Sequence, residues 1–295
     1  MRAQPHDSPA SAATAGTLYV VATPIGNPDD LSPHAARVLG QVDLVACEDT
    51  RRTGLLLARM GLSKPMVSYF EHNEQRRADE LVARLRTGQN VALVTDAGTP
   101  AISDPGYRLV RAAWDAEIPV RAVAGPSAAV TALSIAGLPT DRFVFEGFLP
   151  VRDNERKRAL EQLANEPRTM VFFETARRLP VTVAAMAQIF GRERLAAVVR
   201  EISKTHEEVL RATLGELTER LAQNPVLGEV TLVIDGTGWR RNRRKPAQEL
   251  TIESLREAGL TLGQAAAVLA RLGGTSRGEV YRQAVTSGHG ETAKD

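Results

Sequence analysis

Residues suited to ligand binding gather in one segment of this sequence, at positions 95–106. The segment contains two carboxylates, Asp96 and Asp104, which accept hydrogen bonds, and glycines that allow a ligand to approach the backbone closely. The apolar run 91–94 before it predicts a buried strand, and a helical pattern follows it. Ligands of open α/β sheets bind outside the carboxyl ends of strands, so segment 95–106 is a candidate binding loop. The same composition also fits an alternative interpretation, in which segment 95–106 is an ordinary strand-to-helix connection and Asp96 only stabilises its own turn.

Two further segments repeat this arrangement, and they strengthen the interpretation as a binding site. Segment 23–30 follows a predicted strand and contains Pro24, Gly26 and Asn27, and segment 124–128 follows another predicted strand. The hydroxyl of Ser127 could contact a ligand, cap the helix that follows, or do both.

Several common chemistries are disfavoured by the motifs that the sequence lacks. The first loop has no GxGxxG fingerprint, which argues against a dinucleotide-binding Rossmann domain. No GxxxxGK[ST] or HExxH segment occurs, so P-loop phosphoryl transfer and zinc proteolysis are disfavoured. The single cysteine, Cys47, excludes an internal disulfide and any CxxC metal site, and we expect no bound metal.

The overall charge does not identify a partner, but its local distribution is informative. The net charge is only +2, and arginine greatly outnumbers lysine among the basic residues. Segment 239–245 places a tryptophan beside five cations, which suits contact with an RNA backbone but also describes a solvated linker. The arginines that we predict to bind RNA in this segment are Arg240, Arg241, Arg243 and Arg244.

The sequence shows neither a membrane-spanning segment nor a secretion signal. No apolar run approaches the roughly 20 residues that span a bilayer. The segment 1–16 is rich in Ala, Ser and Pro and has no apolar core, so we expect a disordered tail. A soluble, cytoplasmic protein is expected.

Strand-like apolar runs alternate with helical patterns, which predicts an α/β fold with two lobes. The first lobe, 17–125, should hold a mostly parallel sheet of strands 18–22, 42–46, 91–94 and 120–123, with helices at 32–39, 51–60, 74–86 and 107–116. The second lobe, 126–236, should hold strands 143–146, 170–174, 195–201 and 229–235, with helices at 127–136, 154–165, 179–190 and 214–223. A basic linker, 237–245, then leads to a small helical unit, 246–295, whose helices at 252–258, 262–272 and 277–285 resemble a helix-turn-helix. That unit is either a docked appendage or an RNA contact.

The loops, in this order, resemble those of the tetrapyrrole-methylase superfamily of S-adenosylmethionine (SAM) enzymes. Within it the chain is similar to the branch that methylates the 2'-hydroxyl of a cytidine in small-subunit ribosomal RNA. The resemblance spans roughly Thr17 to Asp235 and is carried by segments 22–27, 47–51, 68–74, 95–106, 125–128, 137–143 and 200–208. The Cys-Glu-Asp-Thr-Arg and Glu-His-Asn-Glu segments favour RNA over a tetrapyrrole acceptor. Relatives that act on tetrapyrroles open instead with a glycine-rich first loop.

The resemblance implies a bilobal fold, SAM bound in the cleft between the lobes, and a homodimer. The target would be a cytidine in the decoding region of small-subunit (16S) rRNA, within the assembled subunit. The positions that the resemblance assigns to SAM are Pro24, Asp96, Ala97, Gly98, Ile102, Ser127, Ala128 and Thr175.

Methyl transfer to a ribose hydroxyl also needs groups that activate a weak nucleophile. Two polar clusters can supply them, one at 48–52 with 71–74 and one at 201–208. We predict that Lys204 stabilises or deprotonates the hydroxyl and that Glu201 tunes Lys204. Glu48 completes the catalytic group and, with Arg51 and His72, would help to hold the RNA. Each residue could instead have a purely structural role: Lys204 in an exposed ion pair, Glu48 as a carboxylate at a helix terminus and His72 as a polar loop residue.

Two other functions compete with RNA methylation. The same fold could methylate a tetrapyrrole or another small acceptor. Alternatively, the chain could be an RNA-binding module that has lost catalysis, although its intact loop motifs argue against that.

Overall fold

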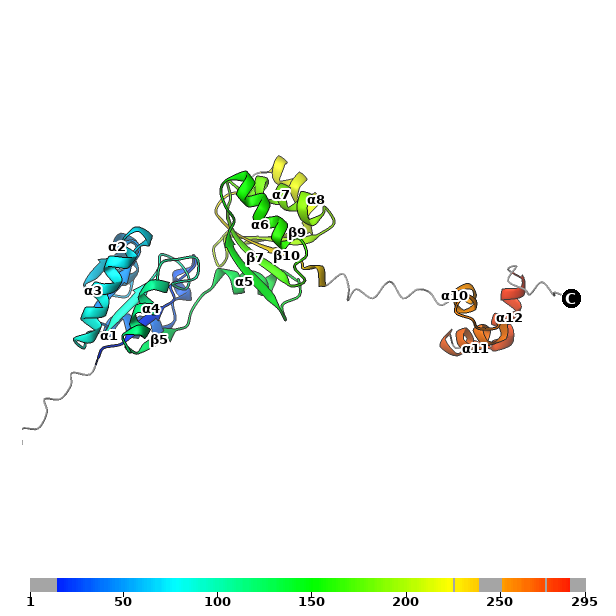
Figure 1. Ribbon diagram of the computed structural model, residues 1–295, viewed down its shortest axis with the longest axis horizontal. Coiled ribbons are helices and arrows are strands. Elements are labelled where there is room, and N and C mark those ends of the chain that lie inside the picture. Colours follow the sequence, from blue (N-terminus) through cyan, green and yellow to red (C-terminus); the bar gives the residue numbers. More distant parts are fainter. Residues whose placement is uncertain (1–14, 225, 239–250, 274, 287–295) are drawn as a thin grey trace, which may run out of the picture. The chain divides into compact units, whose positions relative to one another are not determined.

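The computed structural model describes residues 15–224, 226–238, 251–273 and 275–286. The chain separates into two compact units, Met1–Thr237 and Gly238–Asp295, shown as ribbons in Figure 1. Nearly all of the predicted tail, 1–16, lies outside the described residues, and so do Arg240, Arg241, Arg243 and Arg244. The backbone N–H of Gly16 donates to the carbonyl of Leu85 at 2.8 Å, so the last residue of that predicted tail is packed on the fold.

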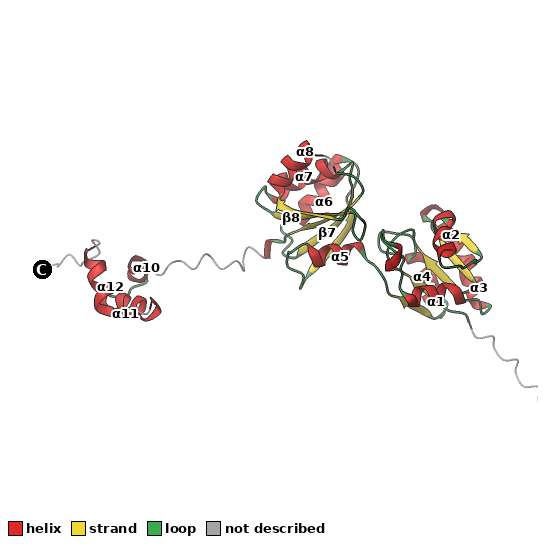
Figure 2. Ribbon diagram, turned by 180° about the vertical axis from the view of Figure 1, so that it is seen from behind, coloured by secondary structure: helices red, strands yellow, loops and turns green. Residues whose placement is uncertain are grey.

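The first unit contains two five-stranded sheets, each flanked by helices (Figure 2). The strands of the first sheet run parallel in the order β3-β2-β4-β1-β5. Their bounds are β1 Leu18–Val21, β2 Leu44–Cys47, β3 Met66–Ser68, β4 Val91–Val94 and β5 Val120–Val123. The expected parallel sheet is therefore present. The prediction omitted β3, a three-residue edge strand whose partly exposed residues lack a clear apolar pattern.

The second sheet is mixed and has the order β6-β7-β10-β8-β9. β6 runs parallel to β7, and the remaining pairs are antiparallel. The bounds are β6 Phe143–Phe148, β7 Thr169–Thr175, β8 Leu195–Arg200, β9 Glu208–Thr213 and β10 Glu229–Ile234. The prediction also omitted β9, because its two charged residues and half-buried positions obscure the alternation of a strand.

Both faces of each sheet are buried, which explains the nearly continuous apolar strands. Along β4, Val91 and Leu93 belong to one core cluster, whereas Ala92 and Val94 belong to the cluster on the opposite face. Cys47 is fully buried in that second cluster, where burial raises the pKa of its thiol. It packs as a small apolar side chain, as the sequence predicted.

The helices of the first unit cover these sheet faces. Their bounds are α1 Pro33–Gln41, α2 Thr50–Arg59, α3 Glu74–Arg86, α4 Tyr107–Asp115, α5 Ala128–Ile135, α6 Asp153–Leu163, α7 Leu179–Phe190 and α8 Leu214–Gln223. Two short 3-10 helices are η1 Pro28–Asp30 and η2 Glu71–Asn73. Asn73 stands at the N-cap position of α3, where asparagine is a favoured cap, but its side chain makes no capping hydrogen bond to α3. The Asn73 carboxamide oxygen instead accepts from the N–H of Phe70 at 2.9 Å, which closes η2.

The described part of the second unit, 251–273 and 275–286, contains three short helices, α10 Ile252–Glu257, α11 Leu262–Gly273 and α12 Arg277–Ala284. Its small core consists of Leu255, Leu262, Ala265, Ala266, Ala270 and Ala284. Among the residues that the structure describes, no helix has the length and apolar character needed to cross a membrane.

Candidate active site

The three predicted binding loops are joined by hydrogen bonds at the carboxyl edge of the first sheet. The backbone N–H of Thr23 donates to the carbonyl of Gly98 at 2.8 Å, and the N–H of Gly98 returns a bond at 3.1 Å. The hydroxyl of Thr99 donates to the carbonyl of Pro126 at 3.2 Å. Segments that are far apart in the sequence therefore form one continuous surface.

Residues with strained backbone conformations occur in the binding loop 95–106 and in the polar segment 201–208. Ala101 and Ser103 have φ angles of 70° and 60°, and Glu201 and Ser203 have φ angles of 51° and 64°. Non-glycine residues rarely adopt this left-handed region, and such strain concentrates at functional sites. Loop 201–208 therefore resembles the binding loop 95–106 in its strained backbone as well as in its polar side chains.

A cavity of about 420 Å³, here called the large cavity, lies against these loops. Every predicted SAM position except Pro24 lines it, namely Asp96, Ala97, Gly98, Ile102, Ser127, Ala128 and Thr175. The second sheet contributes Phe148, Phe173, Glu174 and residues of β10. The volume lies within the roughly 300–1,000 Å³ range of small-molecule sites.

A second cavity of about 250 Å³, here called the small cavity, adjoins the large one. Pro24 lines the small cavity together with Lys204 and residues of α2. The two cavities share Ile25, Arg52, Asp96, Ala97 and Glu229 as wall residues. The arrangement thus offers two adjoining compartments.

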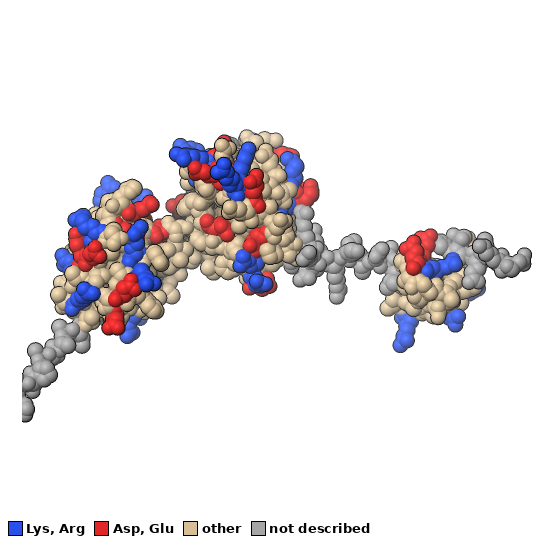
Figure 3. Space-filling view, viewed as in Figure 1, with Lys and Arg blue, Asp and Glu red and all other residues tan. Residues whose placement is uncertain are grey.

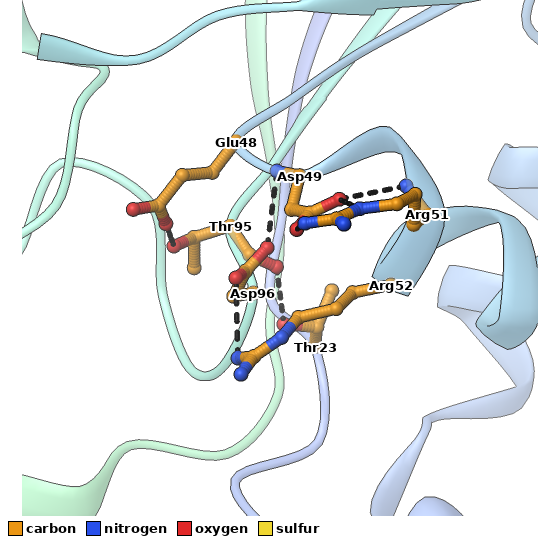
Figure 4. A network of polar contacts seen from close by, with 7 residues as sticks. All are labelled: Thr23, Glu48, Asp49, Arg51, Arg52, Thr95 and Asp96. Atoms are coloured by element: carbon orange, nitrogen blue, oxygen red, sulfur yellow. Dashed lines mark hydrogen bonds and ion pairs between the residues drawn. The ribbon is translucent and has the colours of Figure 1, made fainter.

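Asp96 stands in a polar network at this shared wall (Figure 4). One of its oxygens accepts from the N–H of Asp49 at 3.2 Å, and the other lies 3.2 Å from Nη1 of Arg52. Both partners belong to the start of α2, so Asp96 connects two segments rather than only fixing its own turn. The sequence analysis selected Arg51 as a site residue and not Arg52. Adjacent residues of a helix point in directions about 100° apart, so only one of the two can face Asp96, and the sequence does not show which one.

The predicted RNA residues Arg51 and His72 lie on the surface and line neither cavity. Arg51 forms an ion pair with Asp49 at 2.8 Å, and its side chain is 88% exposed. The ring of His72 packs nearly perpendicular to the ring of Phe70, with the centroids 6.3 Å apart. Contact of either residue with a large substrate remains a prediction.

Two carboxylates of the first lobe face the large cavity beside Asp96. The hydroxyl of Thr95 donates to Glu48 at 3.2 Å, which holds this predicted catalytic residue at the cavity wall. Burial and the nearby Glu48 raise the pKa of Asp104 to about 6. The sequence indicated Asp104 only as a hydrogen-bond acceptor, because a raised pKa depends on tertiary neighbours.

Lys204 lines the small cavity between two carboxylates. Its Nζ lies 3.2 Å from Oε1 of Glu201 and 3.2 Å from Oε2 of Glu229. Burial works against the charged form, but these two hydrogen bonds outweigh it and hold the pKa of Lys204 above its ordinary value. The ammonium is therefore a fixed cation at neutral pH.

The remaining predicted catalytic residue, Glu201, supports Lys204 and lines neither cavity. It accepts the backbone N–H of Glu229, and this bond together with Lys204 lowers the pKa of Glu201. Lys204 also packs against the first loop, since a Cβ on Gly26 would lie 2.5 Å from its Cγ and Cε. The hydroxyl of Ser203 donates to Asp30 at 2.5 Å, a second tie between these loops.

Ser127 stands at the N-cap position of α5, but its side chain makes no capping hydrogen bond. Its carbonyl accepts from Thr131 at 2.9 Å instead. The capping alternative for the hydroxyl is therefore wrong, and the side chain lines the large cavity.

Comparison with known proteins places this site in a family. The family model for tetrapyrrole (corrin/porphyrin) methylases matches residues 17–218. The chain is 43% identical to "Ribosomal RNA small subunit methyltransferase I" of Escherichia coli O157:H7, covering 92% of this chain and 95% of that protein. It is 44% identical to the protein of the same name from Pseudomonas aeruginosa, covering 92% and 98%.

Solved structures with the same fold include tetrapyrrole enzymes. The uroporphyrin-III C-methyltransferase of Thermus thermophilus, in complex with S-adenosyl homocysteine, matches with a TM-score of 0.53 and 20% identity, covering 77% of this chain and all of that one. A cobalt-precorrin-4 methyltransferase matches with a TM-score of 0.55 and 20% identity, covering 74% and 94%. These neighbours support the fold. The family match and the close relatives establish that this chain belongs to the tetrapyrrole methylase family of SAM-dependent methyltransferases.

Proposed function

We propose that this protein transfers a methyl group from SAM to the ribose 2'-hydroxyl of a cytidine in the decoding region of 16S rRNA. The observation that carries the proposal is the relationship, over more than nine tenths of the chain, to proteins named as small-subunit rRNA methyltransferases. The cytidine, the 2'-hydroxyl and the decoding region rest on the resemblance of segments 47–51, 68–74 and 200–208. The same resemblance supports a cytoplasmic homodimer that acts on the assembled small subunit.

The residues of the large cavity suit SAM. Glu48, Asp96 and Asp104 provide negative charge for a sulfonium cation, and small residues such as Ala97 and Gly98 let the backbone contact a ligand closely. When bound there, SAM supplies an activated methyl group. The protein must then mainly position the acceptor, because proximity and orientation provide much of the rate enhancement.

The small cavity suits the acceptor hydroxyl. Lys204 is held as a cation by Glu201 and Glu229, so it stabilises the oxygen as negative charge develops on it. A lysine with a raised pKa keeps its proton at neutral pH, so Lys204 acts through its charge rather than as the base. The hydroxyl proton needs another acceptor, and Glu48 is our choice for that role. Glu48 lines the large cavity but accepts a hydrogen bond from Thr95, which lines the small cavity, so its carboxylate lies close to the place where the two cavities meet.

The direct test combines labelled SAM, the purified full-length protein and small ribosomal subunits from a strain that lacks the modification. Nuclease digestion and mass spectrometry would then locate the label. We expect one 2'-O-methylated cytidine in the decoding region. SAM binding without incorporation into RNA would contradict the proposal, and a change in visible absorbance with tetrapyrrole substrates would then identify a small acceptor.

A further inference from the structure

Strand β6 ends in an irregularity that determines where its last side chain points. In the register with β7, Phe145 lies opposite Val171, Gly147 opposite Phe172, and Phe148 opposite Phe173. One residue of β6 is therefore extra, which is the definition of a β-bulge. Bulges commonly redirect a side chain next to an active site.

The bulge moves Phe148 to the face of the sheet that borders the large cavity. In a regular strand, residues three positions apart point to opposite faces. Here the rings of Phe145 and Phe148 both contact Phe173, with centroid distances of 4.9 Å and 5.6 Å, so all three lie on one face. Without the bulge, Phe148 would point to the opposite core, which contains Phe172.

Gly147, within the bulge, packs closely against Ser103 of the binding loop 95–106. Gly147 has a φ angle of 65°, which favours glycine, and a Cβ there would lie 3.1 Å from Oγ of Ser103. The bulge thus rests against the strained tip of loop 95–106. This packing holds Phe148 beside the loop that carries four of the eight predicted SAM positions, Asp96, Ala97, Gly98 and Ile102.

Phe148 nevertheless remains open to solvent. Its side chain is 52% exposed although it lines the large cavity, whereas Phe145 and Phe173 are partly buried beside it. A large apolar ring held open at a cavity wall gains free energy when a flat apolar partner covers it. Nucleobases are such partners, and the protein would handle two of them: the adenine of SAM and a base of the RNA.

We propose that Phe148 is a stacking platform for a base of the RNA substrate, an inference that rests on the proposed function. Proteins that recognise single-stranded or splayed-out RNA stack the unstacked bases on aromatic side chains. The RNA base is favoured over adenine because Phe148 is open to solvent, from which a large substrate arrives. Positions that the resemblance assigns to SAM line the same cavity, such as Asp96 and Ser127 on the loops and Thr175 at the end of β7, so a base stacked on Phe148 would lie beside the bound cofactor.

The test compares Phe148→Ala with Phe148→Trp, which restores an aromatic face, and with Val151→Ala. Val151 is also exposed, at 73%, but lines neither cavity and is a matched surface control. SAM affinity is measured by calorimetry, and kcat and KM by methyl transfer to small subunits. Thermal unfolding shows whether each variant is folded.

We expect Phe148→Ala to lower kcat/KM for the RNA about tenfold or more, mainly through KM, because base stacking contributes that much binding. SAM affinity should stay within about twofold of the wild type. Phe148→Trp should recover most of the loss, and Val151→Ala should behave as wild type.

Three outcomes would overturn the inference in distinguishable ways. A loss of SAM affinity with an unchanged KM for RNA would assign the ring to adenine. Unchanged values for both ligands, with an active wild type, would show that Phe148 is only a cavity wall. An inactive wild type on small subunits would refute the proposed function itself and the stacking role with it.

Discussion

Arg52 and Asp96 form an ion pair, with Nη1 and Oδ2 3.2 Å apart, at the wall that the two cavities share. The Arg52 side chain is 69% exposed, so the pair itself contributes only about 0–1 kcal/mol to stability. Its importance lies in its position. It fixes the orientation of Asp96 at the boundary between the proposed cofactor and acceptor compartments.

Replacing Asp96 with alanine should weaken SAM binding. The change removes a negative charge from the large cavity and the acceptor for the N–H of Asp49. Hydrogen bonds to charged groups contribute about 1.5–3 kcal/mol, so we expect the SAM dissociation constant to rise about tenfold or more in calorimetry. Asp96→Asn keeps an acceptor but not the charge and should give an intermediate value. Equal affinities for all three proteins would remove Asp96 from the SAM site.

Replacing Ser127 with tryptophan should block the large cavity. The indole would occupy part of the roughly 420 Å³ that Ser127 lines, so SAM affinity should fall by about tenfold or more. Ser134→Trp is the matched control, because Ser134 lies exposed on the same helix and lines neither cavity. If both variants bind SAM normally in calorimetry, the ligand does not occupy the space beside Ser127.

Replacing Lys204 with alanine should separate catalysis from cofactor binding. Lys204 lines the small cavity and not the large one, so SAM affinity should stay within about twofold. Removing a group that stabilises an oxyanion lowers kcat by about 10²–10³-fold. Lys204→Arg keeps the cation and should retain part of the activity. Normal turnover by the alanine variant, in the methyl transfer assay, would exclude Lys204 from the mechanism.

The carboxyl of Asp104 should make SAM affinity depend on pH. Its pKa is raised to about 6, so the group gains negative charge as the pH rises through 6. SAM carries a sulfonium charge that S-adenosylhomocysteine lacks. The ratio of SAM to S-adenosylhomocysteine affinity should therefore increase severalfold, that is by about 1 kcal/mol or less, between pH 5 and 7.5. Asp104→Asn should remove this change, and a ratio that stays constant in the wild type would refute it.

The same carboxyl should destabilise the fold as the pH rises. Because the folded-state pKa of Asp104 is raised from 3.8 to about 6, the native state binds more protons than the unfolded state between these values. Stability therefore falls with increasing pH across this window, by linkage. Asp104→Asn should show a flatter dependence of its melting temperature from pH 4 to 6 than the wild type. An identical dependence in both proteins would contradict the raised pKa.

The sequence by itself determined the family, the α/β class and most of the elements. Each of these depends on local patterns, such as the apolar run 91–94 followed by a polar loop, or the helical pattern 179–190. It also indicated that loops 23–30, 95–106 and 124–128 act together, since loops after parallel strands meet at one edge of a sheet. It did not reveal β3 and β9, because short or charged edge strands lack a clear apolar pattern.

Only the tertiary structure decided how individual side chains are used. It turned Arg52 rather than Arg51 toward Asp96, enclosed Lys204 between Glu201 and Glu229, and placed Pro24 in a different cavity from the other predicted SAM positions. It also moved Phe148 to the cavity face through one extra residue in β6. The physical reason is that direction, burial and pKa depend on neighbours distant in the sequence. A local pattern specifies that a strand or loop forms, but not which of its side chains meet.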